Sequence, residues 1–327
     1  MTFIARRLAF YAVAVWAAVS INFMIPRLMP GNAIDSVLGR FQNLTPGVVK
    51  SLEVEFGFHP KGSIFSQYIQ YWNDVIHFNL GISTSQYPTH VSTIIGQTLP
   101  WTLALVGVAT VLSFTIGTLL GIVAGWRRGG WLDRVMPGLT VLQAMPYFFL
   151  ALLVIYLFAI KLNWLPYGQG YQLGLTEGFN WPFISSAVTH SILPAITIIA
   201  TTIGGWMLQM RNVMLTTISE DYVLVAQAKG LSTRRVMFTY SARNAILPNI
   251  AGFALALGFV VAGALVMEIV FSYPGIGLTL YNAVTSNDYP LTQGIFLVIS
   301  LAVLTASLLA DVVYAIADPR ARSRSAF

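Results

Sequence analysis

Six long apolar runs constrain this chain more than any other feature. Each has at least 18 residues, and about 20 apolar residues in a helix cross the hydrocarbon core of a bilayer. A spanning segment must satisfy its own backbone hydrogen bonds, which favours helices. The sequence therefore predicts an all-α, polytopic membrane protein with six transmembrane helices. The runs are Leu8 to Ile25, Leu99 to Trp126, Val135 to Ile160, Ser191 to Met210, Ile250 to Met267 and Tyr289 to Ala310.

The composition supports this class, with 56% hydrophobic and 9% charged residues, against about 25% charged in soluble domains. Arg6 and Arg7 precede the first run as in a signal peptide, but the run is long and lacks a small-residue cleavage site, so a retained anchor is predicted. The net charge of +6 does not indicate nucleic-acid binding, because the basic residues sit at the ends of apolar runs.

The basic residues also predict the orientation. Five of the eighteen fall on one side, and the other thirteen mark the cytoplasmic side. Both termini and the loop 217–248 are therefore expected in the cytoplasm. The thirteen are Arg6, Arg7, Arg127, Arg128, Arg134, Arg211, Lys229, Arg234, Arg235, Arg243, Arg320, Arg322 and Arg324.

The runs suggest three parts. Residues 1–98 form an N-terminal transmembrane anchor and a small extracytoplasmic segment, 99–318 a five-helix core, and 319–327 a basic cytoplasmic tail. Within the extracytoplasmic segment we expect helices over 46–56 and 65–78. The second carries Tyr68, Tyr71, Trp72 and Phe78 on one face, which is expected to be the core of that segment.

The loop 217–248 is predicted to fold as two short helices. Thr217 and Glu220 have the spacing of a capping box, and Gly230 supplies a left-handed stop after a basic last turn. Ser232 is a candidate N-cap of the second helix, which should end at Pro248. Such a bent pair of helices would form a compact protrusion that another protein could bind. The alternative is an ordinary amphipathic turn at the membrane interface.

Small residues recur inside the apolar runs. Small residues at every fourth position let two helices approach closely, which is one explanation of this spacing. A surface along which helices slide during transport would use the same residues. The predicted packing residues are Gly117, Gly121, Gly125, Ala254, Gly258 and Ala262. After the fifth run the turn-forming residues Tyr273, Pro274, Gly275 and Gly277 are expected to cap the outer mouth of the bundle.

Two acids lie at the edges of runs, Glu268 and Asp311. Intramembrane carboxylates are functional candidates by default, although structural pairing or a helix-end role is favoured here because both lie near an interface. A proton-driven carrier needs a chain of such acids, and none is present. This weakens the hypothesis of a secondary transporter.

Known enzyme patterns do not fit either. No lysine follows a glycine, so the sequence lacks a phosphate-binding GxxxxGK[ST] loop, and it has no HExxH motif. The four histidines are not paired at metal-ligand spacing, and the absence of cysteine excludes thiolate chemistry. We therefore predict no catalytic, cofactor or metal site in this chain. An ATPase-independent channel or a membrane enzyme stays as the alternative of another class.

Several segments together resemble one family. The segments 220–223, 226–232, 234–236 and 243–248 are similar to the cytoplasmic loop of permease subunits in bacterial ABC importers for dipeptides, oligopeptides and nickel. The segments 25–31, 43–99, 163–166, 268–277 and 318–320 resemble other parts of the first permease type in that family. Against the generic importer loop Glu-Ala-Ala-x3-Gly, Ala226 and Gly230 agree, but Leu224 stands where the glutamate would be.

The resemblance implies a type I importer half that works by alternating access. Its partners would be a second homologous permease, two ATP-binding subunits that use ATP and Mg, and an extracytoplasmic binding protein. A di- or oligopeptide is the expected substrate, with an oligosaccharide or nickel as alternatives. The face formed by Tyr222, Val225 and Ala226 is expected to enter an ATPase groove, and Ser241 to face away from it. The expected docking residues are Glu220, Asp221, Tyr222, Val225, Ala226, Lys229, Gly230, Leu231, Ser232, Arg234 and Arg235.

Overall fold

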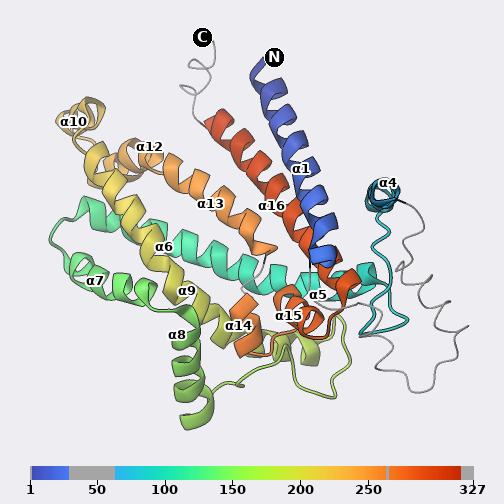
Figure 1. Cartoon of the computed structure of the whole chain (residues 1–327). Helices are drawn as coiled ribbons and strands as arrows, with labels where there is room; N and C mark the ends of the chain where they lie inside the picture. Colours follow the sequence, from blue (N-terminus) through green and yellow to red (C-terminus); the bar gives the residue numbers. More distant parts are fainter. Residues whose placement is uncertain (1, 29–62, 263–264, 318–327) are drawn as a thin grey trace, which may run out of the picture. The chain divides into compact units, whose positions relative to one another are not determined.

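The computed structural model describes residues 2–28, 63–262 and 265–317, and within these ranges the chain is helical with no β-strand (Figure 1). The predicted helix 46–56 and the tail 319–327 lie outside the described residues. The elements are α1 (Thr2–Leu28), α4 (Ile64–Ile76), α5 (Val91–Thr102), η1 (Leu103–Gly107), α6 (Val108–Trp126), α7 (Trp131–Ala144), α8 (Tyr147–Val154), η2 (Ile155–Lys161), α9 (Trp181–Thr217), α10 (Asp221–Ala228), α11 (Thr233–Arg235), η3 (Val236–Ala242), α12 (Arg243–Ala245), α13 (Leu247–Val260), α14 (Leu265–Val270), α15 (Ile276–Thr285) and α16 (Tyr289–Ala317).

Four helical stretches are long and apolar enough to cross a membrane: Arg7–Ile25, Val91–Trp126, Trp181–Thr217 and Tyr289–Val312. Two further candidates are bent pairs, α7 with α8 and η2 at 103°, and α11 to α12 with α13 at 54°. Counting each bent pair as one span gives six. The structure thus agrees with an all-α membrane protein, in which two of the predicted straight spans are bent or interrupted.

Proline explains the first of these breaks. Met145 is extended (φ −71°, ψ 138°) and Pro146 directly precedes α8. A proline has no N–H to donate and favours an extended residue before it, so it favours the break that interrupts the helix predicted over 135–160 at this point. In the fifth run α13 ends at Val260 and α14 starts at Leu265, which corrects the single helix predicted over 250–267.

The chain forms two compact units, each made of several segments. Unit 1 comprises residues 1–102, 261–265 and 274–305, and unit 2 comprises 103–260, 266–273 and 306–327. The units therefore do not follow simple sequence boundaries.

Unit 1 has an apolar core between α5, α15 and the first part of α16. The buried residues of this core are Val91, Ile94, Ile95, Ile276, Leu280, Ala283, Leu291 and Ile295. Asp288, just before α16, is fully buried. Its carboxylate Oδ1 accepts a hydrogen bond from the backbone N–H of Leu291 at 3.1 Å. Its Oδ2 accepts from the backbone N–H of Ser85 at 2.9 Å, from Ser85 Oγ at 2.6 Å and from Ser83 Oγ. The acid thus caps α16 and holds the loop before α5.

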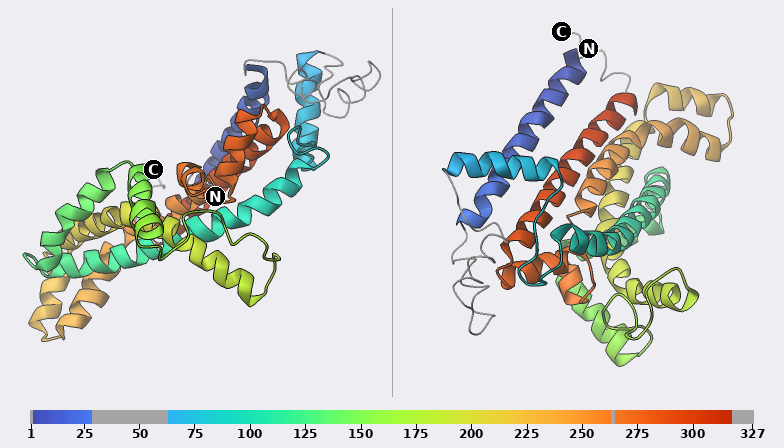
Figure 2. Two further views of the ribbon diagram at one scale, coloured as in Figure 1. Left: turned by 90° about the horizontal axis from the view of Figure 1, so that it is seen from below. Right: turned by 90° about the vertical axis from the view of Figure 1, so that its right-hand side faces the viewer.

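α1 and α4 also belong to unit 1, and α4 crosses α1 near its C-terminal end (Figure 2). Tyr68 shares a hydrogen bond of 2.7 Å with Ser20, and both Tyr68 and Tyr71 pack on the ring of Phe23. The helix predicted over 65–78 is confirmed with slightly earlier bounds. Tyr68 and Tyr71 pack against α1, but Phe78 lies after the helix and is exposed, which corrects the single aromatic face.

Unit 2 is built on α6 and α9, which lie side by side (Figure 1). A Cβ atom at Gly117 would lie 2.8 Å from Trp206 Cβ, one at Gly121 2.5 Å from the carbonyl oxygen of Met207, and one at Gly125 2.5 Å from Met214 Cβ. Only a residue without a side chain allows this approach.

The second predicted stripe of small residues is shorter than expected. Gly258 is buried in α13 and Ala254 is partly buried. Ala262 follows the end of α13 at Val260, so it does not lie on the same helix face.

Candidate functional site

The segment from α10 to α12 forms a helical hairpin, which we call the 221–245 hairpin (Figure 1). It begins later than predicted. Thr217 is the last residue of α9, and its hydroxyl donates to the carbonyl oxygen of Val213 at 2.8 Å. Glu220 stands at the N-cap of α10 without a side-chain cap hydrogen bond. The predicted capping box is therefore wrong, because α9 extends through Thr217 and a turn separates it from α10.

The turn of the hairpin follows the prediction more closely. Gly230 has φ +70°, the left-handed conformation that glycine adopts without strain. Ser232 is the N-cap residue of α11, although its side chain makes no cap hydrogen bond. The second helix continues through η3 to Ala245 and then bends into α13. The second helix therefore ends three residues before the predicted end at Pro248, and Pro248 lies in the first turn of α13, where proline is tolerated.

The hairpin has a small core of its own. Val223, Ala226 and Val236 are buried together, and Trp126, Leu231 and Tyr240 pack against them. Ala226 is only 2% exposed. This corrects its predicted place on the docking face, because the methyl group points at the second helix of the hairpin and no partner could reach it there.

The outward face of α10 is apolar instead. Tyr222 is 39% exposed, Leu224 51% and Val225 52%. We call these three residues the α10 surface. Leu224 was missed in the sequence because residues 222–226 are all apolar, and such a run does not show which side faces the core. The buried pair Val223 and Ala226, three residues apart, resolves the ambiguity.

The other predicted docking residues lie in α10, in α11 and in the turns beside them. Leu231 is partly buried in the hairpin core, and the remaining polar and glycine positions are exposed. These are Glu220, Asp221, Lys229, Gly230, Ser232, Arg234 and Arg235. The acidic residues thus lie at the start of α10, and the basic residues lie at its end and in α11.

The hairpin is attached to the long helices of unit 2 through its second helix. Ala242 and Ala245 pack in one cluster with Met210 and Met214 of α9 and Ile122 of α6. Trp126 packs against this cluster and against the core of the hairpin as well. The hairpin is therefore packed directly against α6 and α9. Ser241, expected to face away from the docking groove, is fully buried inside unit 2 and is therefore not an exposed position of the hairpin.

Two polar contacts secure the same region. The fully buried Asn249 of α13 donates to Thr118 Oγ1 of α6 at 3.2 Å and to the carbonyl oxygen of Trp206 of α9 at 3.4 Å. Amide side chains that join helices in this way stabilise membrane bundles. The contact fixes the start of α13 just beyond the hairpin.

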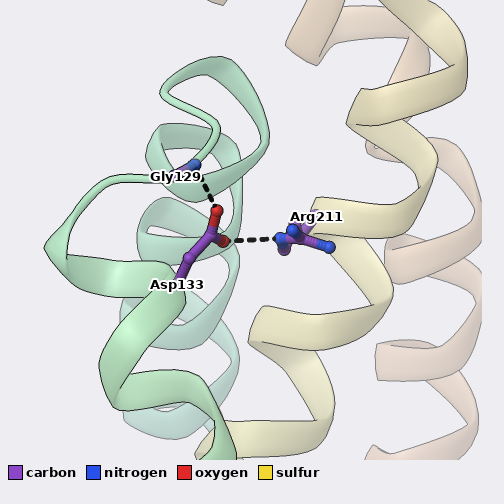
Figure 3. A network of polar contacts seen from close by, with 3 residues as sticks. All are labelled: Gly129, Asp133 and Arg211. Carbon is purple, nitrogen blue, oxygen red and sulfur yellow. Dashed lines mark hydrogen bonds and ion pairs between the residues drawn. The ribbon is translucent and has the colours of Figure 1, made fainter.

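An ion pair holds the loop between α6 and α7. The guanidinium Nε of Arg211 on α9 lies 2.8 Å from Asp133 Oδ1, and the backbone N–H of Gly129 donates to Asp133 Oδ2 at 2.6 Å (Figure 3). Arg128 also donates to the carbonyl oxygen of Leu215 at 3.3 Å. The loop is therefore tied to the last turns of α9, next to the hairpin.

The segment after α14 was predicted to form an outer turn. The Tyr273 side chain is buried in unit 2, where its hydroxyl lies 3.1 Å from Ser191 Oγ. The backbone N–H of Tyr273 donates to the carbonyl oxygen of Glu268 at 2.8 Å. Glu268 is itself fully buried. In unit 1, Gly275 is the N-cap of α15, Gly277 is buried in its first turn, and Pro274 is partly buried. The helix does stop before this run, as the turn-forming residues require.

The family comparison decides how these elements are to be understood. Residues 117–323 match the family described as binding-protein-dependent transport system inner membrane component. The chain belongs to this family. It is therefore a multi-pass membrane subunit of a transport system and has no enzymatic role of its own. The match includes α9, the hairpin and the segment after α14.

Three relatives show the extent of the similarity. The di/tripeptide transport system permease protein DppB of Pseudomonas aeruginosa is 31% identical over 98% of this chain and 99% of its own length. A protein of Brucella suis biovar 1 is 33% identical over 91% and 92%. One of Sinorhizobium fredii is 31% identical over 98% and 99%. The last two carry provisional names as peptide permeases.

Proposed function

We propose that this chain is one permease subunit of an ATP-driven importer for di- or oligopeptides, and that an ATP-binding subunit docks on the α10 surface. Membership of the transport family and the peptide permease names of the relatives support the substrate class. A binding protein delivers the substrate and a second homologous permease completes the pathway. Two ATP-binding subunits supply ATP and Mg chemistry.

The observation that carries the docking site is the exposure of Tyr222, Leu224 and Val225. Apolar side chains on a short helix outside the long spans are costly to leave in water, at about 25 cal/mol for each Å². Exposed patches of this kind, with a polar rim, are typical of protein–protein contacts. The thirteen-to-five distribution of basic residues supports a cytoplasmic position for the hairpin and for both termini.

The packing of the hairpin supports a coupling mechanism. When the ATP-binding subunits close, the hairpin moves as a unit around its own core. Trp126 passes this movement to α6, and the contacts of Ala242 and Ala245 pass it to α9. The α6 and α9 helices, in close contact along the glycine stripe, then move together, so the pathway opens first to the outside and then to the cytoplasm.

We also propose that the segment around Tyr273, Pro274, Gly275 and Gly277 lies at the outer end of the pathway. Residues 1–98 form the anchor and extracytoplasmic part, and residues 99–318 the permease core. In unit 1, Gly275 is the N-cap of α15 and the buried Gly277 lies in its first turn, which supports a fixed turn at the start of α15.

The test compares two arginine substitutions on α10. Val225→Arg places a charge on the α10 surface, where an unpaired buried charge costs about 3–5 kcal/mol, or roughly a 10²- to 4 × 10³-fold loss of affinity. Gln227→Arg is the control, because Gln227 is exposed on the same helix and, two residues from Val225, lies on the other side of the helix from it. We expect Val225→Arg to reach the membrane and to lose both the ATP-binding subunits on purification and the uptake of radiolabelled dipeptide. Gln227→Arg should retain both, and equal behaviour of the two variants would contradict the docking surface.

A further inference from the structure

The short helix α4 has two adjacent apolar stripes, and α1 covers only one of them. Tyr68 and Tyr71, three residues apart, contact α1. Phe65, Ile69 and Ile76 form the second stripe, at positions i, i+4 and i+11, and are 71%, 52% and 66% exposed. The opposite side of the helix carries exposed polar residues, namely Ser66, Gln70 and Asn73. α4 is thus strongly amphipathic with half of its apolar face bare.

The contacts with α1 place α4 at the depth of the C-terminal end of the α1 span. The span candidate in α1 ends at Ile25, and Arg27 lies two residues further along the chain. Arg27 Nη1 donates to the carbonyl oxygen of Phe23 at 2.7 Å, and Nη2 donates to Gln67 Oε1 of α4 at 2.8 Å. The guanidinium carbon also lies 3.6 Å from the centre of the Phe23 ring. An arginine at the end of a span marks the boundary between hydrocarbon and head groups, so α4 lies at that boundary.

The direction of the α4 helix axis also fits a position at the membrane boundary. In Figure 1 α1 runs upright while α4 is seen end-on, and in the right-hand view of Figure 2 α4 crosses α1. If α1 spans the bilayer, a helix that crosses it at its end runs along the membrane surface. With 13 residues, α4 is also far too short to span the hydrocarbon core.

The chemistry of the bare stripe fits lipid. α1, the neighbouring element of the same unit, exposes large apolar side chains such as Val13, Trp16 and Ile21 along its span, so a lipid-facing surface continues from α1 to α4. The one charged residue of α4, Asp74, lies on its polar side. Amphipathic helices of this kind bury their apolar face at the boundary between head groups and acyl chains.

We propose that α4 is a membrane-surface helix, which inserts Phe65, Ile69 and Ile76 into the lipid at the Arg27 end of α1. The partner of this surface is the bilayer itself. The proposal rests on the membrane location of the chain and is independent of the proposed peptide transport.

Nitroxide labels in the full chain test this directly, because the sequence contains no cysteine. Single cysteines at Ile69, at Gln70 and at the lipid-facing Val13 are labelled, and the protein is placed in lipid nanodiscs. Collision rates are then measured with molecular oxygen, which concentrates in lipid, and with nickel–ethylenediaminediacetate, which stays in water. The label at Val13 is the reference for lipid and the label at Gln70 the reference for the aqueous side of α4.

We expect the label at Ile69 to resemble that at Val13, with frequent oxygen collisions and at least a several-fold lower nickel accessibility than at Gln70. Nickel accessibility at Ile69 equal to that at Gln70 would overturn the proposal, because the stripe would then face water. Low accessibility to both reagents would overturn it as well, because protein and not lipid would then cover the stripe. This experiment does not measure peptide uptake, so a failure of this inference can be distinguished from a failure of the proposed function.

Discussion

The substitution Gly121→Ala tests the packing of α6 on α9. The new Cβ would lie 2.5 Å from the carbonyl oxygen of Met207 and 2.7 Å from Met210 Cβ, whereas ordinary contact begins at 3.4 Å. The two helices must therefore separate locally by about 0.9 Å, and overpacking of this kind costs about 1–3 kcal/mol. Because a change of 1 kcal/mol moves the melting temperature of a chain of a few hundred residues by about 2–4 °C, we expect a decrease of several degrees.

The assay is thermal unfolding of the purified chain in one detergent. Gly138→Ala is the matched control, because Gly138 lies in α7 of the same unit and a methyl group added there would meet no heavy atom within 4 Å. Alanine is favoured over glycine in a helix by about 0.5–1 kcal/mol, so this control should be neutral or slightly stabilising. If both variants unfold at the same temperature, the glycine stripe does not hold α6 and α9 together.

Two further predictions follow from orientation and from burial. A cysteine at Ser63 should react with an impermeant thiol reagent in intact cells and one at Lys229 should not, and the reverse pattern would invert the proposed topology. Asp133→Asn removes a partly exposed ion pair with Arg211 and should change stability by less than about 1 kcal/mol. Asp288→Asn leaves buried donors without their acceptor and should cost about 1–3 kcal/mol; thermal unfolding of the two variants side by side would refute this ranking if Asp133→Asn were the more harmful.

The class of the protein could be predicted from the sequence because bilayer thickness limits what a long apolar run can become. The stop at Gly230 and the helix over 65–78 were also predictable, since glycine and helical periodicity act locally. The bends were not: whether Pro146 interrupts a span depends on the neighbours that satisfy the freed backbone groups. The orientation of α10 was equally hidden, because residues 222–226 are uniformly apolar and only packing against Val236 turns Ala226 inward.

Thr217 illustrates a different limit. Its spacing to Glu220 fits a capping box, but the same residue can end a preceding helix by donating to Val213, and the length of α9 decides between the two. The two compact units could not be read from the sequence at all, because each combines segments that are far apart along the chain.

The central claim is that the α10 surface receives an ATP-binding subunit. A photoreactive benzoyl-phenylalanine placed at Val225, in cells that contain the complete transport system, tests this most directly. We predict that irradiation gives a covalent adduct with the ATP-binding subunit, identified by mass spectrometry, whereas the same residue at Gln227 gives much less. No adduct with that subunit at Val225, while the labelled protein still transports peptide, would contradict the account.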